Sequence, residues 1–270
     1  MMSPKASISS ATVTITKKKA FLPCFRGDAL SDMGSRFGLA RRKGQSVLTQ
    51  GDGLPERQGG RRIVSMTEGI PITRHPAPPE QVERIRAAVR EAEQLNDSRL
   101  ARPDDAEGLY ALFSEPKVNA PIYSLPRPLS VGNVRNFIED HIAQQARGEG
   151  LLFVRDTGGG QIMGYSDIQV WPEWAAGEIA GGLHPSLHSK GSGTQGAAQT
   201  FTWMFEALHL KLICETASLE NVITQRMLDG MGFHRMGQVM SRRPDGTTRE
   251  SLVWEMGRDE WSAAQRSRPS

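Results

Sequence analysis

The segment that decides the fold is His188–Ala198, which reads HSKGSGTQGAA. Its glycines Gly191, Gly193 and Gly196 have the spacing Gly-x-Gly-x-x-Gly. A glycine-rich loop that enters a helix points its main-chain N–H groups, and the positive end of the helix dipole, at an anion. The segment therefore predicts a site for the phosphates of a cofactor between Gly191 and Thr194.

Two classes of phosphate-bearing cofactor compete for this loop. The spacing is the dinucleotide fingerprint, and Glu215 follows at about the distance of a ribose-binding acid, which favours an NAD(P)-dependent oxidoreductase. However, residues 185–190 separate the glycines from the preceding strand, and a dinucleotide domain needs further βαβ units. A P-loop is excluded because no Gly-Lys-Ser/Thr follows. The oxidoreductase is therefore kept only as the alternative.

The hydrophobic periodicity on both sides of the loop predicts a mixed α/β layer with much antiparallel pairing. The expected order is β-α-α-β-β-β-α-β-α-β-β, with helices on both faces of the sheet. Gly181 and Gly182, inside the expected strand 177–185, indicate a bulge or a close main-chain approach. Helical faces expected to be buried contain Ala106, Leu109, Tyr110 and Phe113; Val134, Phe137, Ile138 and Ile142; and Ala197, Phe201, Met204, Phe205 and Leu208.

The composition divides the chain into segments. Residues 1–65 contain 12 Lys/Arg and 4 Asp/Glu, so they carry +8, and the remainder carries 3 − 8 = −5. This basic segment is expected to be a disordered tail, a transit-type presequence or an extension upstream of a functional start at Met66. We expect a linker and an amphipathic helix over residues 66–97, the main domain over 98–261 and a tail over 262–270.

Together with segments before and after it, the glycine loop resembles the GNAT superfamily of acyl-CoA transferases. His188-x-x-Gly191-x-Gly193 is similar to the pyrophosphate loop of that superfamily, and ENVITQRMLDGMGF is similar to its Asn-x-x-Ser…Gly-Phe segment. RLARPDDAEGLYALFSEP resembles its usual first strand and helix. The resemblance covers about residues 98–261 and is closest to the RimJ/RimL-like branch. It implies a sheet whose central strand pair is splayed, with Gly181–Gly182 as the bulge that opens it.

The resemblance also implies a binding site for acetyl-CoA. The pyrophosphate would be held by the glycine loop, the pantetheine arm by the strand end at Leu183–His184, and the other side of the arm by Asn221. The cofactor-binding residues implied in this way are Leu183, His184, His188, Ser189, Lys190, Gly191, Ser192, Gly193, Thr194 and Asn221. His188 departs from the family pattern, which has Gln or Arg there.

The resemblance also implies direct attack of a primary amine on the thioester in a ternary complex, so no covalent nucleophile is needed. Glu178 is our candidate general base, because it alternates along the strand with Ala180, Gly182 and His184. His184 is a second candidate base. Thr224 is the hydroxyl expected nearest to the leaving thiolate, since Leu228 stands where many members of the superfamily have a tyrosine. Cys214 is expected to be a buried strand residue.

These features together predict an acetyl-CoA-dependent N-acetyltransferase, with a non-catalytic acyl-CoA-binding module as a further alternative. The acceptor is expected to be a small-molecule amine or a protein N-terminus. Arg242 and Arg243 stand where the ribosomal branch often has a glutamate, which would suit a carboxylate-bearing acceptor. The mildly acidic body argues against nucleic acid, and no metal, membrane contact or disulfide framework is expected. We expect a cytoplasmic monomer or homodimer.

Overall fold

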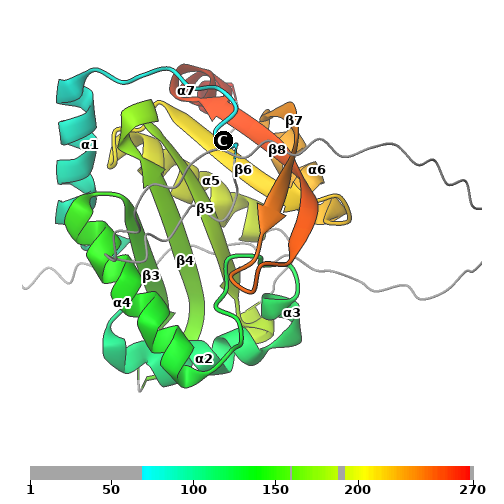
Figure 1. The fold of residues 1–270 in the computed structure, drawn as a ribbon. Helices are drawn as coiled ribbons and strands as arrows, with labels where there is room; N and C mark the ends of the chain where they lie inside the picture. The colour runs from blue at the N-terminus through cyan, green and yellow to red at the C-terminus, as the bar shows by residue number, and fades with distance from the viewer. Residues whose placement is uncertain (1–68, 159, 188–191, 268–270) are drawn as a thin grey trace, which may run out of the picture.

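The computed structural model describes residues 69–158, 160–187 and 192–267. The basic segment over residues 1–65 therefore lies outside the described residues. An eight-stranded sheet runs through the molecule in the order β1-β2-β3-β4-β5-β6-β8-β7 (Figure 1). Its strands are β1 (Gln94–Leu95), β2 (Ser98–Leu100), β3 (Gly150–Asp156), β4 (Ile162–Trp171), β5 (Ala176–Leu183), β6 (Leu212–Ser218), β7 (His234–Arg242) and β8 (Thr248–Gly257).

The sheet is antiparallel at every junction except one, between β5 and β6. Helix α5 (Ser192–Glu206) makes the crossover between these two strands. The other helices are α1 (Pro79–Glu91), α2 (Ala106–Ser114), α3 (Pro116–Asn119), α4 (Val131–Arg147), α6 (Val222–Met231) and α7 (Arg258–Arg266). This architecture confirms the mixed α/β layer and the mostly antiparallel sheet that the sequence predicts.

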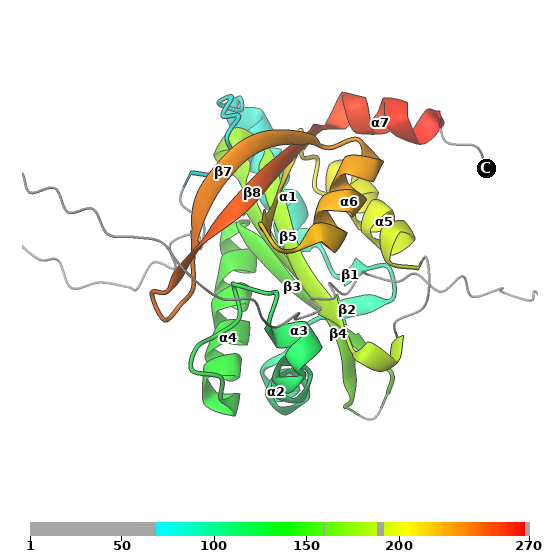
Figure 2. The same cartoon turned by 90° about the vertical axis from the view of Figure 1, so that its right-hand side faces the viewer.

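The helices form two layers, one on each face of the sheet (Figure 2). On one face α1, α5 and α6 cover a core that includes Phe205, Ile168 and Trp254. On the other face α2 and α4 cover a smaller core around Phe113 and Tyr165. All five residues predicted to line the inner face of α5 and its C-terminal extension are buried: Ala197, Phe201, Met204, Phe205 and Leu208.

Two predictions about buried residues are wrong. Tyr110 is 36% exposed and Ile142 is 44% exposed, although both continue apolar stripes of their helices. The buried stripe of α4 is narrower than predicted and includes polar His141 and Gln144 instead. Apolar periodicity alone does not show that this part of the sheet presents polar side chains to the helix.

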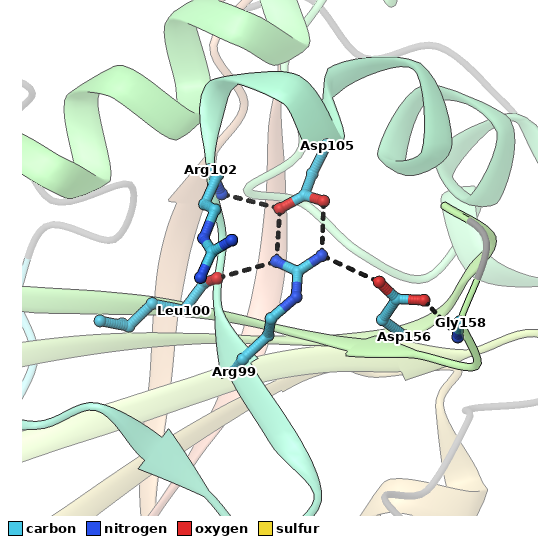
Figure 3. A network of polar contacts seen from close by, with 6 residues as sticks. All are labelled: Arg99, Leu100, Arg102, Asp105, Asp156 and Gly158. Carbon is cyan, nitrogen blue, oxygen red and sulfur yellow. Dashed lines mark hydrogen bonds and ion pairs between the residues drawn. The ribbon is translucent and has the colours of Figure 1, made fainter.

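A network of charged residues connects strand β2 to neighbouring parts of the fold (Figure 3). The guanidinium of Arg99 donates hydrogen bonds of 2.7 Å to both carboxylate oxygens of Asp105, and one of 3.0 Å to Asp156. Asp105 also accepts from the main-chain N–H of Arg102, at 2.7 Å. The network therefore joins β2 to the start of α2 and to the end of β3.

The division of the chain into residues 66–97 and 98–261 remains a proposal. Helix α1 and strand β1 precede residue 98, yet Ile85, Val89 and Leu95 are buried in the main core. Further upstream, Glu255 on β8 accepts from the main-chain N–H groups of Ile72 and Thr73, at 2.6 and 3.0 Å. The segment that follows residue 68 therefore packs on the same body as the main domain.

Candidate active site

The central strands β5 and β6 are paired only at their first residues. The parallel ladder consists of Ala176 opposite Leu212 and Gly177 opposite Ile213. Beyond these pairs β5 remains paired to β4 as far as Leu183, and β6 remains paired to β8 as far as Ser218. Each strand therefore follows its outer neighbour, and the two diverge from Glu178 onward. This splay confirms the expected opening of the central strand pair.

The splay does not arise from a bulge at Gly181–Gly182, which the resemblance implies. These glycines are in regular register with Ser166 and Tyr165 of β4, and the pairing of β5 to β6 has already ended at Gly177. The alternative interpretation, a close main-chain approach, holds for Gly181. A Cβ there would lie 2.7 Å from the carbonyl oxygen of Tyr165.

The main chain of β5 presents alternate N–H groups to the splay. The N–H of His184 donates to Met163 on β4 at 2.8 Å, whereas that of Ile179 donates at 3.1 Å to Glu215 on β6. Because main-chain groups alternate in direction along a strand, the N–H groups of Gly181 and Leu183 point to the same side as that of Ile179. An extended ligand in the splay would therefore lie along this side of β5.

Two acidic side chains lie where the strands diverge. Glu215, which is 7% exposed, reaches across to Ile179. Burial and the charge of Glu178 raise the pKa of Glu215 well above the usual range. On the opposite face Thr216 donates a hydrogen bond of 2.7 Å to the carboxylate of half-buried Glu178. Glu215 thus has a local structural role, while Glu178 lies at the start of the splay.

The environment of Glu178 suits a general base that works near neutral pH. Burial raises the pKa of this carboxyl to about 7, and the charge of Asp167 contributes in the same direction. The hydrogen bond from Thr216 and the positive charge of Arg249 act against this rise. A base is most effective when its pKa lies near the working pH. Glu178 therefore has the protonation behaviour that amine deprotonation requires.

A second layer of polar residues lies behind Glu178 on the same face of the sheet. Asp167 of β4 accepts from Gln169 at 3.3 Å, and Gln169 is the direct cross-strand neighbour of Glu178. Asp167 also forms a buried pair with His141 of α4, with 2.9 Å between Oδ1 and Nε2. Burial alone would lower the pKa of His141, but the charge of Asp167 and the hydrogen bonds to Asp167 and to the carbonyl of Phe137 together outweigh burial, so this pKa is raised. Helix α4 thus supports the wall of the site through polar contacts.

Asn221 and Thr224 lie at the start of α6. The Oδ1 of Asn221 accepts from the main-chain N–H of Thr224 at 3.2 Å and caps the helix. The hydroxyl of Thr224 is buried, and it has no hydrogen-bond partner among the residues that the structure describes. Helix capping therefore involves Asn221 and the main chain of Thr224, but not the threonine side chain.

The other predicted site residues have different surroundings. His184 Nδ1 lies 2.7 Å from the hydroxyl of Ser186, so this side chain supports the turn after β5. His188, Ser189, Lys190 and Gly191 lie outside the described residues. Ser192 and Gly193 begin α5, and Thr194 is exposed in its first turn.

Cys214 is fully buried on β6, and burial raises the pKa of its thiol well above the ordinary value. A reactive cysteine needs the opposite environment, since the thiolate is the nucleophile.

Among residues 69–158, 160–187 and 192–267, no group of three or more His, Cys, Asp and Glu side chains is arranged to hold a metal ion. Within the same residues, no helix is long and apolar enough to span a membrane.

A splayed parallel pair whose crossover helix begins at the open end defines the class of acyl-CoA-binding transferase folds. Residues 99–234, half of the chain, match the family model described as acetyltransferase (GNAT) domain. The chain therefore belongs to the GNAT acetyltransferase family, whose members use acetyl-CoA as the acyl donor. Membership in this family gives no support to the NAD(P)-dependent oxidoreductase that the glycine spacing suggests as the alternative.

Solved structures of similar fold include RimJ from Mycobacterium smegmatis in complex with CoA-disulfide, with 21% identity and a TM-score of 0.51; the match covers 63% of this chain and 86% of that one. The ribosomal-protein-S5-alanine acetyltransferase of Vibrio fischeri has 17% identity and a TM-score of 0.50, and the match covers 62% of this chain and 97% of that one. A putative acetyltransferase from T. thermophilus has 18% identity and a TM-score of 0.51, and the match covers 64% of this chain and 93% of that one. No curated protein matches the sequence. These likenesses support the fold.

Sequence reasoning missed several residues that shape the site: Thr216, Asp167, His141 and Arg249. Thr216 and Arg249 face the same side as Glu178 only because β6 and β8 are in a particular register. The signal for His141 in the sequence is a histidine within the apolar stripe of a helix, two turns after Val134. Such a histidine is consistent with many arrangements, and only the position of Asp167 gives it a partner.

Proposed function

We propose that the protein transfers the acetyl group of acetyl-CoA to a primary amine by direct attack in a ternary complex. The amine nitrogen forms a bond to the thioester carbon, and the carbon–sulfur bond breaks. Two protons leave the original ammonium group; one goes to the sulfur and the other to solvent. The observation that carries this proposal is the position of Glu178, a carboxyl with a pKa of about 7, where the two central strands part.

In this proposal Glu178 accepts the amine proton, either directly or through one water molecule. The ordinary pKa of a lysine-like amine is about 10.4, so deprotonation is a real barrier near neutral pH. Thr216 holds one oxygen of the carboxylate through its 2.7 Å hydrogen bond and fixes the direction of the other. The buried hydroxyl of Thr224, which has no partner among the described residues, would pass a proton to the departing sulfur and take up the second proton of the amine in its place.

The described residues fit the binding of acetyl-CoA. The N–H groups of Gly181 and Leu183 point to the side of β5 that faces the splay and would meet the amide groups of the pantetheine arm. Asn221 uses its oxygen for capping, so its Nδ2 would donate to the arm from the other side. The first turn of α5, from Ser192 to Thr194, would bind the pyrophosphate together with His188, Ser189, Lys190 and Gly191. His184 would contribute through its main chain.

The test is a continuous assay of CoA release with the full-length chain, acetyl-CoA and a panel of primary amines, with the acetylated product identified by mass spectrometry. The proposal expects turnover with at least one amine, and loss of turnover in Glu178→Gln with CoA binding retained. If the chain binds acetyl-CoA and transfers acetyl to none of the amines, it is a non-catalytic acyl-CoA-binding module.

A further inference from the structure

The tip of the β7–β8 hairpin lies beside the loop between α3 and α4 (Figure 1). Contacts of three arginines connect these two segments. We name Arg127, Arg243 and Arg249 the arginine cluster. Arg249 on β8 donates a hydrogen bond of 3.1 Å to the carbonyl of Pro121 in that loop. Arg127 donates to the side chain of Asn119 at 2.7 Å. Segments about 120 residues apart in sequence thus bring three cations together.

The aromatic ring of Tyr123 contacts two of these cations. The guanidinium carbon of Arg243 lies 4.3 Å from the centroid of the Tyr123 ring, and that of Arg249 lies 4.1 Å from it. Cation–π contact stabilises each guanidinium but does not neutralise it. The N–H groups that bind a carboxylate lie in the plane of the guanidinium, whereas a ring contacts its face.

The charges of the arginine cluster lack carboxylate partners. None of the ion pairs among the described residues includes Arg127, Arg243 or Arg249. In all three side chains the Nε–H is buried and has no acceptor in the described part of the chain. Desolvating a cation without pairing it is unfavourable, so clusters of this kind are found where an anion binds.

The charged groups around the cluster do not neutralise it. Asp245 in the hairpin turn acts on Arg127 and Arg243, but its carboxylate is exposed and accepts from the N–H and hydroxyl of Thr247. Glu178 acts on Arg249 at longer range, and Arg249 acts on Glu178. The cluster therefore retains net positive charge, and its nearest member lies within electrostatic reach of the proposed base.

We propose that the arginine cluster binds a carboxylate of the acceptor, so that the enzyme acetylates amines that carry a carboxylate on the same molecule. This inference rests on the proposed function, because it places the amine at Glu178 and the carboxylate at Arg243 and Arg249. Tyr123 sets the orientation of both guanidinium groups. A free amino acid and a peptide with an acidic residue near its N-terminus present the same chemistry to the cluster.

The test compares acceptors that differ only in the carboxylate. Initial rates are measured for the full-length chain with glutamate against glutamine and with alanine against alaninamide. A third pair consists of two C-terminally amidated peptides, one with glutamate and the other with glutamine as its second residue. The carboxylate member of at least one pair should have a KM about 10- to 100-fold lower, which corresponds to one charge-assisted hydrogen bond. The free amino acids and the peptide distinguish the two sources of the carboxylate.

The same comparison is then repeated with Arg243→Gln and Arg249→Gln, each of which should abolish the preference and leave the KM for acetyl-CoA unchanged. Arg242→Gln is the matched control, because Arg242 adjoins Arg243 in sequence but is exposed. It should keep the preference. Arg243→Lys retains the charge but loses the planar guanidinium that can donate two parallel hydrogen bonds to a carboxylate. It should therefore show part of the preference that Arg243→Gln lacks. Thermal midpoints identify any variant that does not fold.

A binding measurement separates this inference from the proposed function. The thermal midpoint of the CoA-saturated protein is measured with N-acetylglutamate against N-acetylglutamine and with N-acetylalanine against N-acetylalaninamide, none of which requires turnover. A larger shift with the carboxylate member of either pair that disappears in Arg243→Gln supports the cluster as a carboxylate site even if no acceptor is found. Equal shifts within both pairs, or equal KM values within every acceptor pair, would overturn the inference and leave acetyl transfer itself untouched.

Discussion

Thr216 of β6 donates a hydrogen bond of 2.7 Å to Glu178 of β5, one residue after the parallel pairing of these strands has ended. The bond replaces a main-chain ladder contact with a side-chain contact at the point of divergence. It also orients the carboxylate that we assign as the general base. The divergence of β5 and β6 therefore places Thr216 where its hydroxyl orients the proposed base.

Removing this hydroxyl should shift the pH dependence of catalysis. The hydrogen bond from Thr216 lowers the pKa of Glu178, so Thr216→Val should raise that pKa. A base with a higher pKa is less ionised at pH 7, and kcat/KM there should fall about three- to tenfold. Activity should recover at high pH, where both proteins are ionised. The measurement is kcat/KM from about pH 5.5 to about 9.5, a range that spans the titration of this base.

Thr216→Ser keeps the hydroxyl and is the matched control for this shift. Its pH profile should overlay that of the wild type. A loss in Thr216→Val that is the same at every pH would instead indicate that the threonine only packs against its neighbours.

Glu178 should make the folded state less stable as the pH rises. Its folded-state pKa of about 7 lies above the ordinary value of 4.5. Below pH 4.5 the carboxyl is neutral in both states and has no effect; between 4.5 and 7 the unfolded chain ionises first, and stability is lost. Glu178→Gln should therefore be more stable than the wild type by about 1–2 kcal/mol at about pH 8, allowing for partial solvation.

Urea unfolding of both proteins at about pH 8 and about pH 4.5 measures this difference. The gap between them should shrink at the lower pH. A gap that is independent of pH would mean that the substitution changes packing and that the charge of Glu178 is not involved.

Two substitutions of Asn221 separate helix capping from cofactor binding. Asn221→Ala removes the cap and should cost about 1 kcal/mol, whereas Asn221→Ser can still cap α6. Neither variant keeps Nδ2, so both should raise the KM for acetyl-CoA about three- to tenfold. Equilibrium unfolding and initial-rate kinetics give the two readouts. A serine variant with normal KM would remove Asn221 from the acetyl-CoA site.

The close approach at Gly181 predicts a specific sensitivity of β5. A Cβ in Gly181→Ala would meet the carbonyl oxygen of Tyr165 at 2.7 Å, and main chain cannot move aside cheaply. The variant should lose about 1–3 kcal/mol of stability. In Gly132→Ala the new Cβ on α4 meets nothing within 4 Å, so that variant should gain up to about 1 kcal/mol. Unfolding midpoints of the two variants give the comparison, and similar effects in both would contradict it.

Most of the elements can be predicted from the sequence because their signals are local. Ser130 is a residue type that caps helices, and its hydroxyl accepts from the N–H of Asn133 at 3.1 Å. The glycines at the hairpin turns have the positive φ that these turns need, 88° at Gly158 and 86° at Gly246. The inner face of α5 follows from a 3.6-residue period alone.

The site is less accessible from the sequence because its contacts depend on strand register. Alternation places Glu178 on one face of β5, but its partner Thr216 belongs to a strand that is paired with β5 at only two positions. Glycines in a strand suggest a bulge, which would put the start of the splay at Gly181–Gly182, whereas the register of β5 with β4 is regular there. Sequence position marks Arg242 and Arg243 alike, and only the contact of Tyr123 with Arg243 distinguishes them.

The measurement that tests the central claim most directly is the pH profile of kcat/KM for acetyl transfer by the wild type and by Glu178→Gln, with an amine that the wild type acetylates. The account predicts that the wild-type rate rises with pH to a plateau, with a midpoint near 7 that reflects ionisation of Glu178. It also predicts that Glu178→Gln is slower by about 10²- to 10⁴-fold and lacks this midpoint. A variant that keeps the wild-type rate and the same midpoint would show that another group removes the proton.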